Sequence, residues 1–507
     1  MLTSSTPASP INRRRSGVGR LYRSADAAAL GLILLCGLLA RAVLVYGAPV
    51  FIMKDSQSYF LPGWDLAHGL PFDLELRRTP LYSWFVALVL RVFGDQLVPL
   101  AIVQHGLGLI TAAGTYWLGR AVFGRGVGLA AGLLTALAGP LLLFEHYVMP
   151  EALFTCLLVL GVGALVAGLR LGRLRWYFLG GLLLGLAALT RPAAQLAMLA
   201  LPVVALAMRR PLRGVAVSTA LAVAGLATVV TPWMLAVYAD YGVVSTGATV
   251  GEPLIFRTVH QDRGFRLPDP RLTPFSDDAR NQARRTVLEM AAKRENPSAM
   301  VHRLRRDLKL SQPAADVVLR DVALEIIGDQ PLYYAWSTAR LTGALFLGRH
   351  EALSYSWTTR RDRAGEDTLE NWQSVDRVRQ LIQPASPTQR AAYGWVDRVV
   401  NVFQPSRLSL PIGVLFALGM LGCVLRPRWR AGLLLGLTAL ALLLTCTLFS
   451  GAVPRFRYPA DPFIHTVALG GLALCLDAAR SLAARLRSRP SARLAKRVPV
   501  TADLVGR

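Results

Sequence analysis

The sequence reads Lys54-Asp55-Ser56-Gln57-Ser58-Tyr59 and, shortly afterwards, Arg77-Arg78-Thr79-Pro80-Leu81-Tyr82, in a polar loop that follows an apolar stretch at residues 27–46. The apolar stretch has the length that a helix needs to cross the hydrocarbon core of a bilayer. Ionisable groups beside a bilayer are costly unless they are paired or hydrated, so they usually serve a function. The acid and the arginines of this loop are therefore the first candidates for a functional site.

The composition predicts a membrane protein. The chain has 507 residues, of which 53% are hydrophobic and 17% charged, and its mean hydropathy is +0.41. A soluble domain of this length could not bury so much apolar surface. We expect an all-α polytopic membrane protein with about ten transmembrane helices. The predicted spans are residues 27–46, 97–118, 127–144, 150–169, 176–190, 192–208, 214–238, 406–425, 431–449 and 462–480.

The formal net charge of +25 is distributed in a way that indicates orientation and not nucleic-acid binding. Basic residues cluster at both ends of the chain and in alternate loops, at 13–15, 120–125, 170–175, 209–213, 426–430 and 480–497. Membrane proteins keep such clusters on the cytoplasmic side. Both termini are therefore predicted to be cytoplasmic, and the first span is predicted to be an uncleaved anchor in a bacterial inner membrane.

This orientation divides the chain into five parts. They are a basic N-terminus (1–26), a membrane module (27–240) with the outer loop 47–96, a long outer segment (241–404), a second set of spans (405–482) and a basic tail (483–507). An apolar stretch at 331–348 is predicted to lie in the interface, because an eleventh span there would turn the basic 426–430 loop outward. An eleven-span arrangement is the alternative.

The first outer loop is predicted to contain two interfacial helices. The second would begin near Thr79 and Pro80, since threonine caps helices well and proline is tolerated at the first helical position. A charged turn between the helices would present Asp55 together with Arg77 or Arg78 near the lipid headgroups.

Further acids and arginines are predicted on the same outer side. Glu145 ends a span, where the helix dipole disfavours an acid, whereas Glu151 follows Pro150 in a first helical turn, where the dipole favours it. Arg191 separates two spans and is predicted either to act on a ligand or to extend its side chain to the interface. Arg41, late in the first span, is expected to extend to the interface in the same way. Arg455 and Arg457 lie in a proline-rich outer loop, where a bound anion would explain two arginines.

The described motifs resemble the GT-C superfamily of integral-membrane glycosyltransferases, especially the protein mannosyltransferase and aminoarabinose transferase branch. The resemblance covers residues 27–240 and 405–480, and it rests on the acid at Asp55, the following Arg-Thr-Pro-Leu-Tyr helix, the stretch from Glu145 to Glu151 and Arg455-Phe456-Arg457-Tyr458-Pro459. Members of the family often have paired acids in the first loop, whereas here Ser56 follows Asp55. This departure weakens the case for a metal site.

The resemblance implies transfer of a sugar from a polyprenyl-phosphate donor to a lipid, glycan or protein acceptor on the outer face, with inversion at the anomeric carbon. Asp55 is the first candidate for the base and Glu145 the second. The donor phosphate is assigned to Arg78, Arg191, Arg455 and Arg457. The substrate is predicted to contact Tyr59, Tyr82, His146, Glu151 and Tyr458. A divalent metal ion is a possible cofactor with no assigned ligands, and no nucleic-acid partner is expected.

Two other functions stay open at this point. A transporter or flippase of lipid-linked saccharides would place ionisable groups along the interior of several spans. A glycan ligase or polymerase would use a lipid-diphosphate donor and would need the same outer acid and arginines. The sugar, the acceptor and the oligomeric state have no signal in the sequence.

Overall fold

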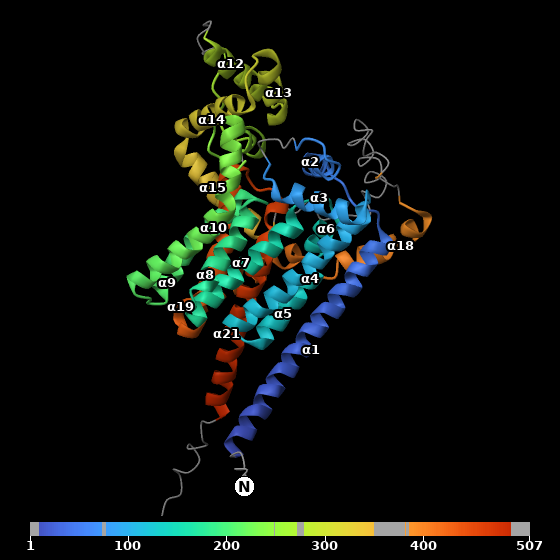
Figure 1. The fold of residues 1–507 in the computed structure, drawn as a ribbon. Helices are drawn as coiled ribbons and strands as arrows, with labels where there is room; N and C mark the ends of the chain where they lie inside the picture. The colour runs from blue at the N-terminus through green and yellow to red at the C-terminus, as the bar shows by residue number, and fades with distance from the viewer. Residues whose placement is uncertain are drawn as a thin grey trace, which may run out of the picture.

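The computed structural model describes residues 10–72, 78–247, 249–270, 278–348, 381 and 385–487. This described part is helical (Figure 1), and it contains no β-strand beyond two isolated bridges, which join Phe51 to Tyr147 and Ala138 to Phe403. Arg77 of the first loop lies outside the described residues.

The first half of the chain forms the helices that carry most of the site. In chain order they are α1 (Pro10–Gly47), α2 (Gln57–Ala67), α3 (Leu81–Phe93), α4 (Leu97–Val122), α5 (Arg125–Leu137), α6 (Gly139–His146), α7 (Glu151–Leu171), α8 (Arg175–Ala188), α9 (Ala200–Ala207) and α10 (Leu212–Tyr241). A 3-10 helix, Pro192–Leu199, precedes α9.

The second half begins with a segment that is predicted to lie outside the membrane, called the extramembrane segment below (residues 249–348 as far as they are described), and it then returns to the bundle. Its helices are α11 (Gly251–Ile255), α12 (Ala279–Ala292), α13 (Pro297–Asp307), α14 (Gln312–Asp329), α15 (Pro331–Phe346), α18 (Pro387–Val400), α19 (Ser409–Leu425), α20 (Leu433–Phe449) and α21 (Asp461–Arg487).

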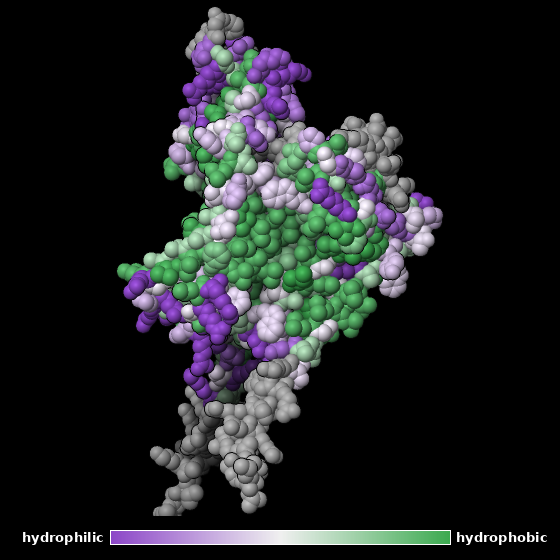
Figure 2. All heavy atoms as spheres, in the orientation of Figure 1, coloured by the Kyte–Doolittle hydropathy of each residue, from purple (hydrophilic) through white to green (hydrophobic). Residues whose placement is uncertain are grey.

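The apolar helices confirm the predicted fold class, an all-α polytopic membrane protein. Six helical stretches of the described chain are long and apolar enough to cross a membrane, namely Ser24–Gly47, Leu97–Val122, Glu151–Leu171, Leu212–Tyr241, Pro427–Phe449 and Pro454–Leu486. Five shorter apolar helices accompany them, namely Leu81–Phe93, Arg125–Leu137, Arg175–Ala188, Pro192–Ala207 and Ser409–Leu425. Figure 2 shows a broad hydrophobic band across the middle of the face in view, with hydrophilic residues above and below it.

Two predicted spans are interrupted. The span predicted at 127–144 breaks at Ala138, whose ψ of 111° is extended and separates α5 from α6. A Cβ on Gly139 would lie 1.9 Å from the carbonyl oxygen of Val400, so the chain of α18 passes directly against this break. The span predicted at 192–208 starts as a 3-10 helix and becomes α-helical only at Ala200. At Ala138 tertiary packing thus overrides the continuous apolar pattern.

The predicted pair of helices in the first outer loop is present as α2 and α3. They pack closely, since the hydroxyl of Ser83 donates to the carbonyl oxygen of Tyr59 over 2.8 Å and a Cβ on Gly63 would lie 2.6 Å from the carbonyl oxygen of Ser83. The second helix starts one residue later than predicted, because Pro80 occupies the N-cap position. Thr79 is buried and makes no capping hydrogen bond.

An ion-pair network ties the first helix to the bundle at the end where α1 begins. The buried carboxylate of Asp26 lies 2.7 Å from Arg120 and 2.8 Å from Arg125, and it accepts a hydrogen bond of 2.6 Å from Tyr116. Figure 1 shows that the end of α21 lies at this same end of the molecule, opposite α12 and α13. The predicted cytoplasmic side is therefore one face of the structure, although its orientation in the cell stays a prediction.

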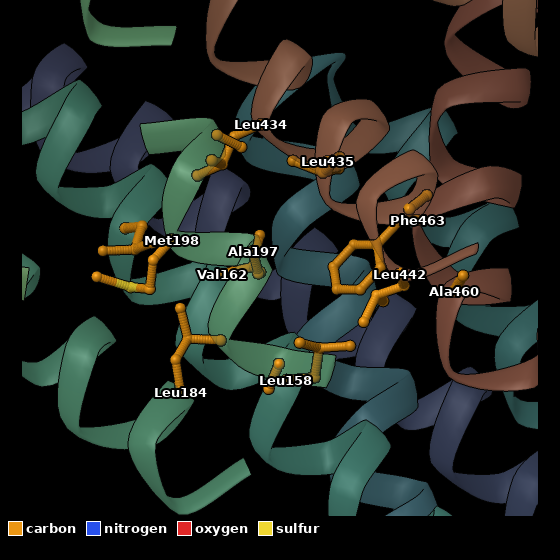
Figure 3. Close-up of a cluster of buried hydrophobic side chains, with 14 of the residues drawn as sticks. Leu158, Val162, Leu184, Ala197, Met198, Leu434, Leu435, Leu442, Ala460 and Phe463 are labelled. Atoms are coloured by element: carbon orange, nitrogen blue, oxygen red, sulfur yellow. The ribbon is translucent and has the colours of Figure 1, made fainter. Parts of the chain in front are cut away.

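Apolar side chains from distant parts of the chain form the largest core. Leu158 and Val162 of α7 and Leu184 of α8 meet Leu442 of α20 and Phe463 of α21, as Figure 3 shows. All five side chains are buried. The last two helices are thus packed into the first module, and they bring the loop between α20 and α21 next to the start of α7.

The extramembrane segment has a core of its own, formed by α11, α12, α13 and α14. At its junction with the bundle, Arg257 is fully buried and donates from Nη2 to the Ser337 hydroxyl over 2.7 Å. Burial alone would raise the pKa of Asp262, but hydrogen bonds from Ser337 and Tyr333 and the charge of Arg257 lower it below its ordinary value. Asp262 is therefore a carboxylate that holds this junction together.

Candidate functional site

The carboxylate of Asp55 lies between two arginines from opposite ends of the chain. Its Oδ1 accepts a hydrogen bond of 3.1 Å from Nη2 of Arg78, and its Oδ2 accepts one of 2.6 Å from Nη2 of Arg455. The three side chains are partly exposed, by 31%, 14% and 20% respectively. The structure thus brings together three residues that the sequence places in one site, and it leaves them accessible from outside the bundle.

Local hydrogen bonds fix the position of Asp55. The chain before it runs beside the turn after α6, because the amide of Phe51 donates to the carbonyl oxygen of His146 and the amide of Val148 donates to that of Phe51. A 3-10 turn, Lys54–Ser56, follows and is closed by the Ser56 hydroxyl, which accepts from the amide of Met53 over 3.0 Å. This geometry directs Asp55 away from the apolar core.

Arg78 is held on three sides. Its Nε donates to the hydroxyl of Ser58 over 2.9 Å, its Nη1 donates to the hydroxyl of Tyr59 over 3.0 Å, and its guanidinium lies 4.4 Å from the centre of the Tyr59 ring. The amide of Leu81 donates to the carbonyl oxygen of Leu189, which fixes the start of α3 to the end of α8. Arg78 is therefore a positioned cation and not a mobile surface arginine.

A second ion pair adjoins the first through an aromatic ring. Arg191 pairs with Glu151, whose side chain is only 2% exposed. The guanidinium of Arg191 lies 5.1 Å from the centre of the Phe456 ring, and that of Arg455 lies 5.3 Å from it. Both arginines therefore contact the same ring, and cation–π attraction stabilises this arrangement. The row Asp55, Arg455, Phe456, Arg191 and Glu151 is called the outer charge row below.

Glu145 lies outside this row, in a buried network. Its carboxylate lies 2.6 Å from Nη2 of Arg41 and 2.9 Å from Nδ1 of His105, and its side chain is 5% exposed. Arg41 is 2% exposed and also donates to the carbonyl oxygens of Gly37, His105 and Ala136. The expectation that Arg41 extends to the interface is wrong, because an internal acid and three carbonyl groups satisfy its donors.

The residues predicted to contact substrate mostly form the wall behind the outer charge row. Tyr82 is fully buried and donates to Gln104 over 2.6 Å, and Gln104 in turn donates to the carbonyl oxygens of Glu145 and Tyr147. His146 is 1% exposed, and one ring nitrogen lies 3.0 Å from Nε2 of His105. Tyr458 is 1% exposed, with its ring centre 5.3 Å from that of Phe144.

The two arginines of the last outer loop occupy different environments. Arg455 belongs to the outer charge row, whereas the side chain of Arg457 is fully buried, with its Nε 3.4 Å from Oδ1 of the equally buried Asp461. The sequence gives no sign of this difference, because the two arginines alternate in one short motif. Arg455 lies within the 3-10 turn Pro454–Phe456, whereas Arg457 follows that turn and lies beside Asp461, the first residue of α21.

The donor groups around Asp55 do not fit a divalent cation. Each carboxylate oxygen already accepts a hydrogen bond from a guanidinium group, and such a cationic surrounding repels a metal ion. Among the described residues no three His, Cys, Asp or Glu side chains are grouped closely enough to hold a metal. The two guanidinium groups here are of the kind that pairs with carboxylates and phosphates.

Comparison with known proteins places this geometry in context. Residues 77–235 match the family described as dolichyl-phosphate-mannose-protein mannosyltransferase. The chain thus resembles the GT-C glycosyltransferases, as its motifs predict. The match includes Arg78, Glu151 and Arg191, while Asp55 and Arg455 lie outside it. No curated protein sequence matches the chain.

Several solved structures are similar to this one. The oligosaccharyltransferase of Archaeoglobus fulgidus in its apo form has 14% identity and a TM-score of 0.46, over 92% of this chain and 52% of that chain. The oligosaccharyltransferase AglB of that organism, with an inhibitory peptide and a dolichol-phosphate, has 13% identity and a TM-score of 0.47, over 93% and 53%. ArnT from Cupriavidus metallidurans, bound to undecaprenyl phosphate, has 14% identity and a TM-score of 0.38, over 87% and 78%. The chain spans about half the length of the oligosaccharyltransferases.

Proposed function

We propose that this protein is a membrane glycosyltransferase that transfers a sugar from a polyprenyl-phosphate donor to an acceptor on the outer face of a bacterial inner membrane. The observation that carries the proposal is the carboxylate of Asp55 held between Arg78 and Arg455 at the surface end of the bundle. An acid and several fixed cations are what the transfer requires, because the acceptor must lose a proton and the leaving phosphate gains charge.

The reaction follows from these roles. The acceptor hydroxyl attacks the anomeric carbon of the donor, and its proton passes to the carboxylate of Asp55. The bond between the anomeric carbon and the phosphate oxygen breaks, so that polyprenyl phosphate leaves with the bonding electron pair. Arg78, Arg455 and Arg191 stabilise the charge that develops on that phosphate. A single displacement of this kind inverts the anomeric centre.

The ion pairs also suggest how the donor would prepare the site. In the structure Asp55 shares its two oxygens with the guanidinium groups of Arg78 and Arg455. A carboxylate paired in this way accepts a proton poorly. A donor phosphate that competes for the same guanidinium groups would release the carboxylate toward the acceptor. Donor binding and activation of the base would then be a single event.

The burial of the remaining candidates assigns them supporting roles in this proposal. Glu145 is engaged by Arg41 and His105 and is proposed to hold the wall of the site, with Tyr82, His146 and Tyr458. Glu151 is proposed to orient Arg191, and Arg457 to orient the start of α21 beside Asp461. No chemical step needs a metal ion.

A lipid phosphate is bound in two of the similar solved structures, in agreement with a lipid-phosphate donor. AglB was solved with a dolichol-phosphate and ArnT with undecaprenyl phosphate. A transporter of lipid-linked saccharides is less well supported, because ion pairs such as Asp26 with Arg120 and Asp55 with Arg78 lie at the two ends of the bundle. The buried network of Arg41, Glu145 and His105 is the feature that a transporter would share. A glycan ligase would use the same site with a lipid-diphosphate donor.

The test is a transfer assay with the purified protein in lipid. Radiolabelled polyprenyl-phosphate sugars are offered with a crude envelope fraction as acceptor, to the wild type and to Asp55→Asn. We expect label to leave the lipid only with the wild type. The matched control is Asp95→Asn, which removes an acid that pairs with His68 outside the site and should keep transfer. Equal turnover by Asp55→Asn would exclude Asp55 as the base.

A second donor series separates the remaining functions. The same assay with lipid-diphosphate sugars would identify a glycan ligase if those donors alone were consumed. Movement of an intact labelled lipid across a vesicle bilayer, without loss of its sugar, would instead identify a transporter.

A further inference from the structure

A cavity of about 340 Å³ lies at the end of the bundle opposite Asp55. It is bordered by the C-terminal end of α7, the start of α8 and the turn before α10, and its lining includes Tyr177, Arg210 and Arg213. Glu151 and Arg191 of the outer charge row lie at the other ends of α7 and α8. A helix of the length of α7 spans about 30 Å, so the two sites lie on opposite faces of the membrane.

The cavity presents positive charge from a fixed turn. Arg209 adopts a left-handed backbone with φ of 59°, which is uncommon for a residue other than glycine and turns the chain sharply between α9 and α10. Arg210 follows and donates from Nη2 to the carbonyl oxygen of Leu169 over 2.7 Å. Both Arg210 and Arg213 line the cavity, so two cationic residues border one small volume.

A tyrosine hydroxyl and a helix start add hydrogen-bond donors. Tyr177 is 5% exposed and lines the cavity, and no hydrogen bond to its hydroxyl occurs among the described residues. Its ring is fixed, because a Cβ on Gly168 would lie 2.9 Å from it. Within α10 the amide of Val215 is bonded to the carbonyl oxygen of Pro211. The amides that precede it carry the positive end of the helix dipole, which favours an anion.

Part of the remaining cavity lining is apolar. Leu174, at the N-cap of α8, and Val217 of α10 lie on its wall and are exposed, and both helices are apolar and belong to the hydrophobic band. In Figure 2 the hydrophilic residues gather directly below that band. A soluble anion would gain nothing from an apolar wall at this depth, whereas a phospholipid offers a phosphate to the arginines and acyl chains to the neighbouring surface.

We infer that this cavity binds the phosphate of an anionic phospholipid in the leaflet opposite the outer charge row. Arg210 and Arg213 pair with the phosphate, the hydroxyl of Tyr177 donates to it, and the acyl chains follow Leu174 and Val217. The inference does not depend on the proposed transfer reaction, because it rests on different residues at the other end of α7 and α8. The lipid would act as a structural ligand that fixes the α9–α10 turn.

The test measures binding of short-chain phosphatidylglycerol to the protein in detergent. Native mass spectrometry detects the bound lipid, and the shift in unfolding temperature measures its effect on stability. Arg213→Gln and Tyr177→Phe should each weaken binding by about fivefold or more, since each loses one contact with the phosphate. The matched control, Arg173→Gln, removes the same charge from the same face without touching the cavity and should bind as the wild type does.

Three results would overturn the inference. A loss of binding in Arg173→Gln equal to that in the two cavity variants would reduce the effect to the general charge of this face. Binding of phosphatidylcholine as tight as that of phosphatidylglycerol would remove the role of net anionic charge. Binding of inorganic phosphate as tight as that of the lipid, with full competition between them, would make the cavity a site for a soluble anion.

Discussion

Arg257 donates a hydrogen bond from Nε to the backbone carbonyl oxygen of Thr447, over 2.9 Å. Tyr334 makes a parallel contact, because its hydroxyl donates to the carbonyl oxygen of Leu448 over 2.8 Å. Both acceptors lie at the end of α20, directly before the loop that carries Arg455. The extramembrane segment thus holds one side of the candidate site, although it contributes no residue to the outer charge row.

Replacement of Arg257 by methionine should destabilise the protein by about 3 kcal/mol. The change leaves the buried Asp262 without its fully buried cationic neighbour and removes the hydrogen bonds to Thr447 and Ser337. Thermal unfolding in detergent measures the effect. Arg263→Gln is the control, because Arg263 is exposed next to the same acid in sequence. An unfolding temperature equal to that of the wild type would show that the junction does not depend on this charge.

Replacement of Arg455 by lysine should raise the KM for the donor by about tenfold, because an ammonium group cannot present the planar fork that a phosphate accepts. Steady-state kinetics with increasing donor measure this. Arg457→Lys is the informative comparison, since Arg457 is fully buried beside Asp461 and should affect unfolding more than the KM. The reverse pattern would return the phosphate role to Arg457.

Replacement of Gly108 by alanine should destabilise the bundle by about 1–3 kcal/mol. The new Cβ would lie 1.9 Å from a carboxylate oxygen of Glu145, and Arg41 and His105 prevent that carboxylate from moving freely. Gly106→Ala is a matched control on the same helix, because a Cβ there meets no atom within 4 Å. Thermal unfolding of the two variants side by side decides the matter, and equal values would show that Glu145 is free to shift.

The stability of the first outer loop should fall as pH rises through the pKa of His68. A hydrogen bond to the carbonyl oxygen of Trp64, and then the neighbouring Asp95, raise this pKa above its ordinary value. The stabilisation is complete below the pKa of about 6.5 that His68 has in the unfolded chain, and it is lost as pH rises above the higher pKa of the folded protein. Unfolding temperatures at about pH 5 and about pH 9, compared with His68→Gln, measure it. Because the pair is partly exposed, the difference should be below about 1 kcal/mol.

Much of the architecture follows from the sequence because long apolar runs are typical of membrane helices. The apolar stretches Ser24–Gly47, Leu97–Val122, Glu151–Leu171 and Leu212–Tyr241 agree with their predicted positions within a few residues. The break at Ala138 could not be predicted, because it is set by contact between Gly139 and the backbone of Val400, far away in the chain. Apolar composition carries no information about such a contact.

The meeting of Asp55, Arg78 and Arg455 could be anticipated only as far as their shared side of the membrane. Sidedness comes from the distribution of basic loops, whereas pairing comes from the packing of α20 and α21 into the first module. The burial of Glu145 and Arg457 could not be predicted from the sequence either, because it too depends on how distant helices pack. Both residues adjoin polar turns in sequence, yet their partners, Arg41 and Asp461, take them into the interior. Their catalytic roles stay predictions.

The pairing of Asp55 with Arg455 also sets an order for biogenesis. The carboxylate is synthesised early, while its partner arrives 400 residues later, with the last membrane helix. Until that helix inserts, the first loop lacks one of its two cations and the ring of Phe456 that contacts Arg455 and Arg191. If the proposed function is right, prematurely terminated chains would therefore occupy the membrane without a competent site, and a donor lipid would meet a working arrangement only after α21 has been inserted.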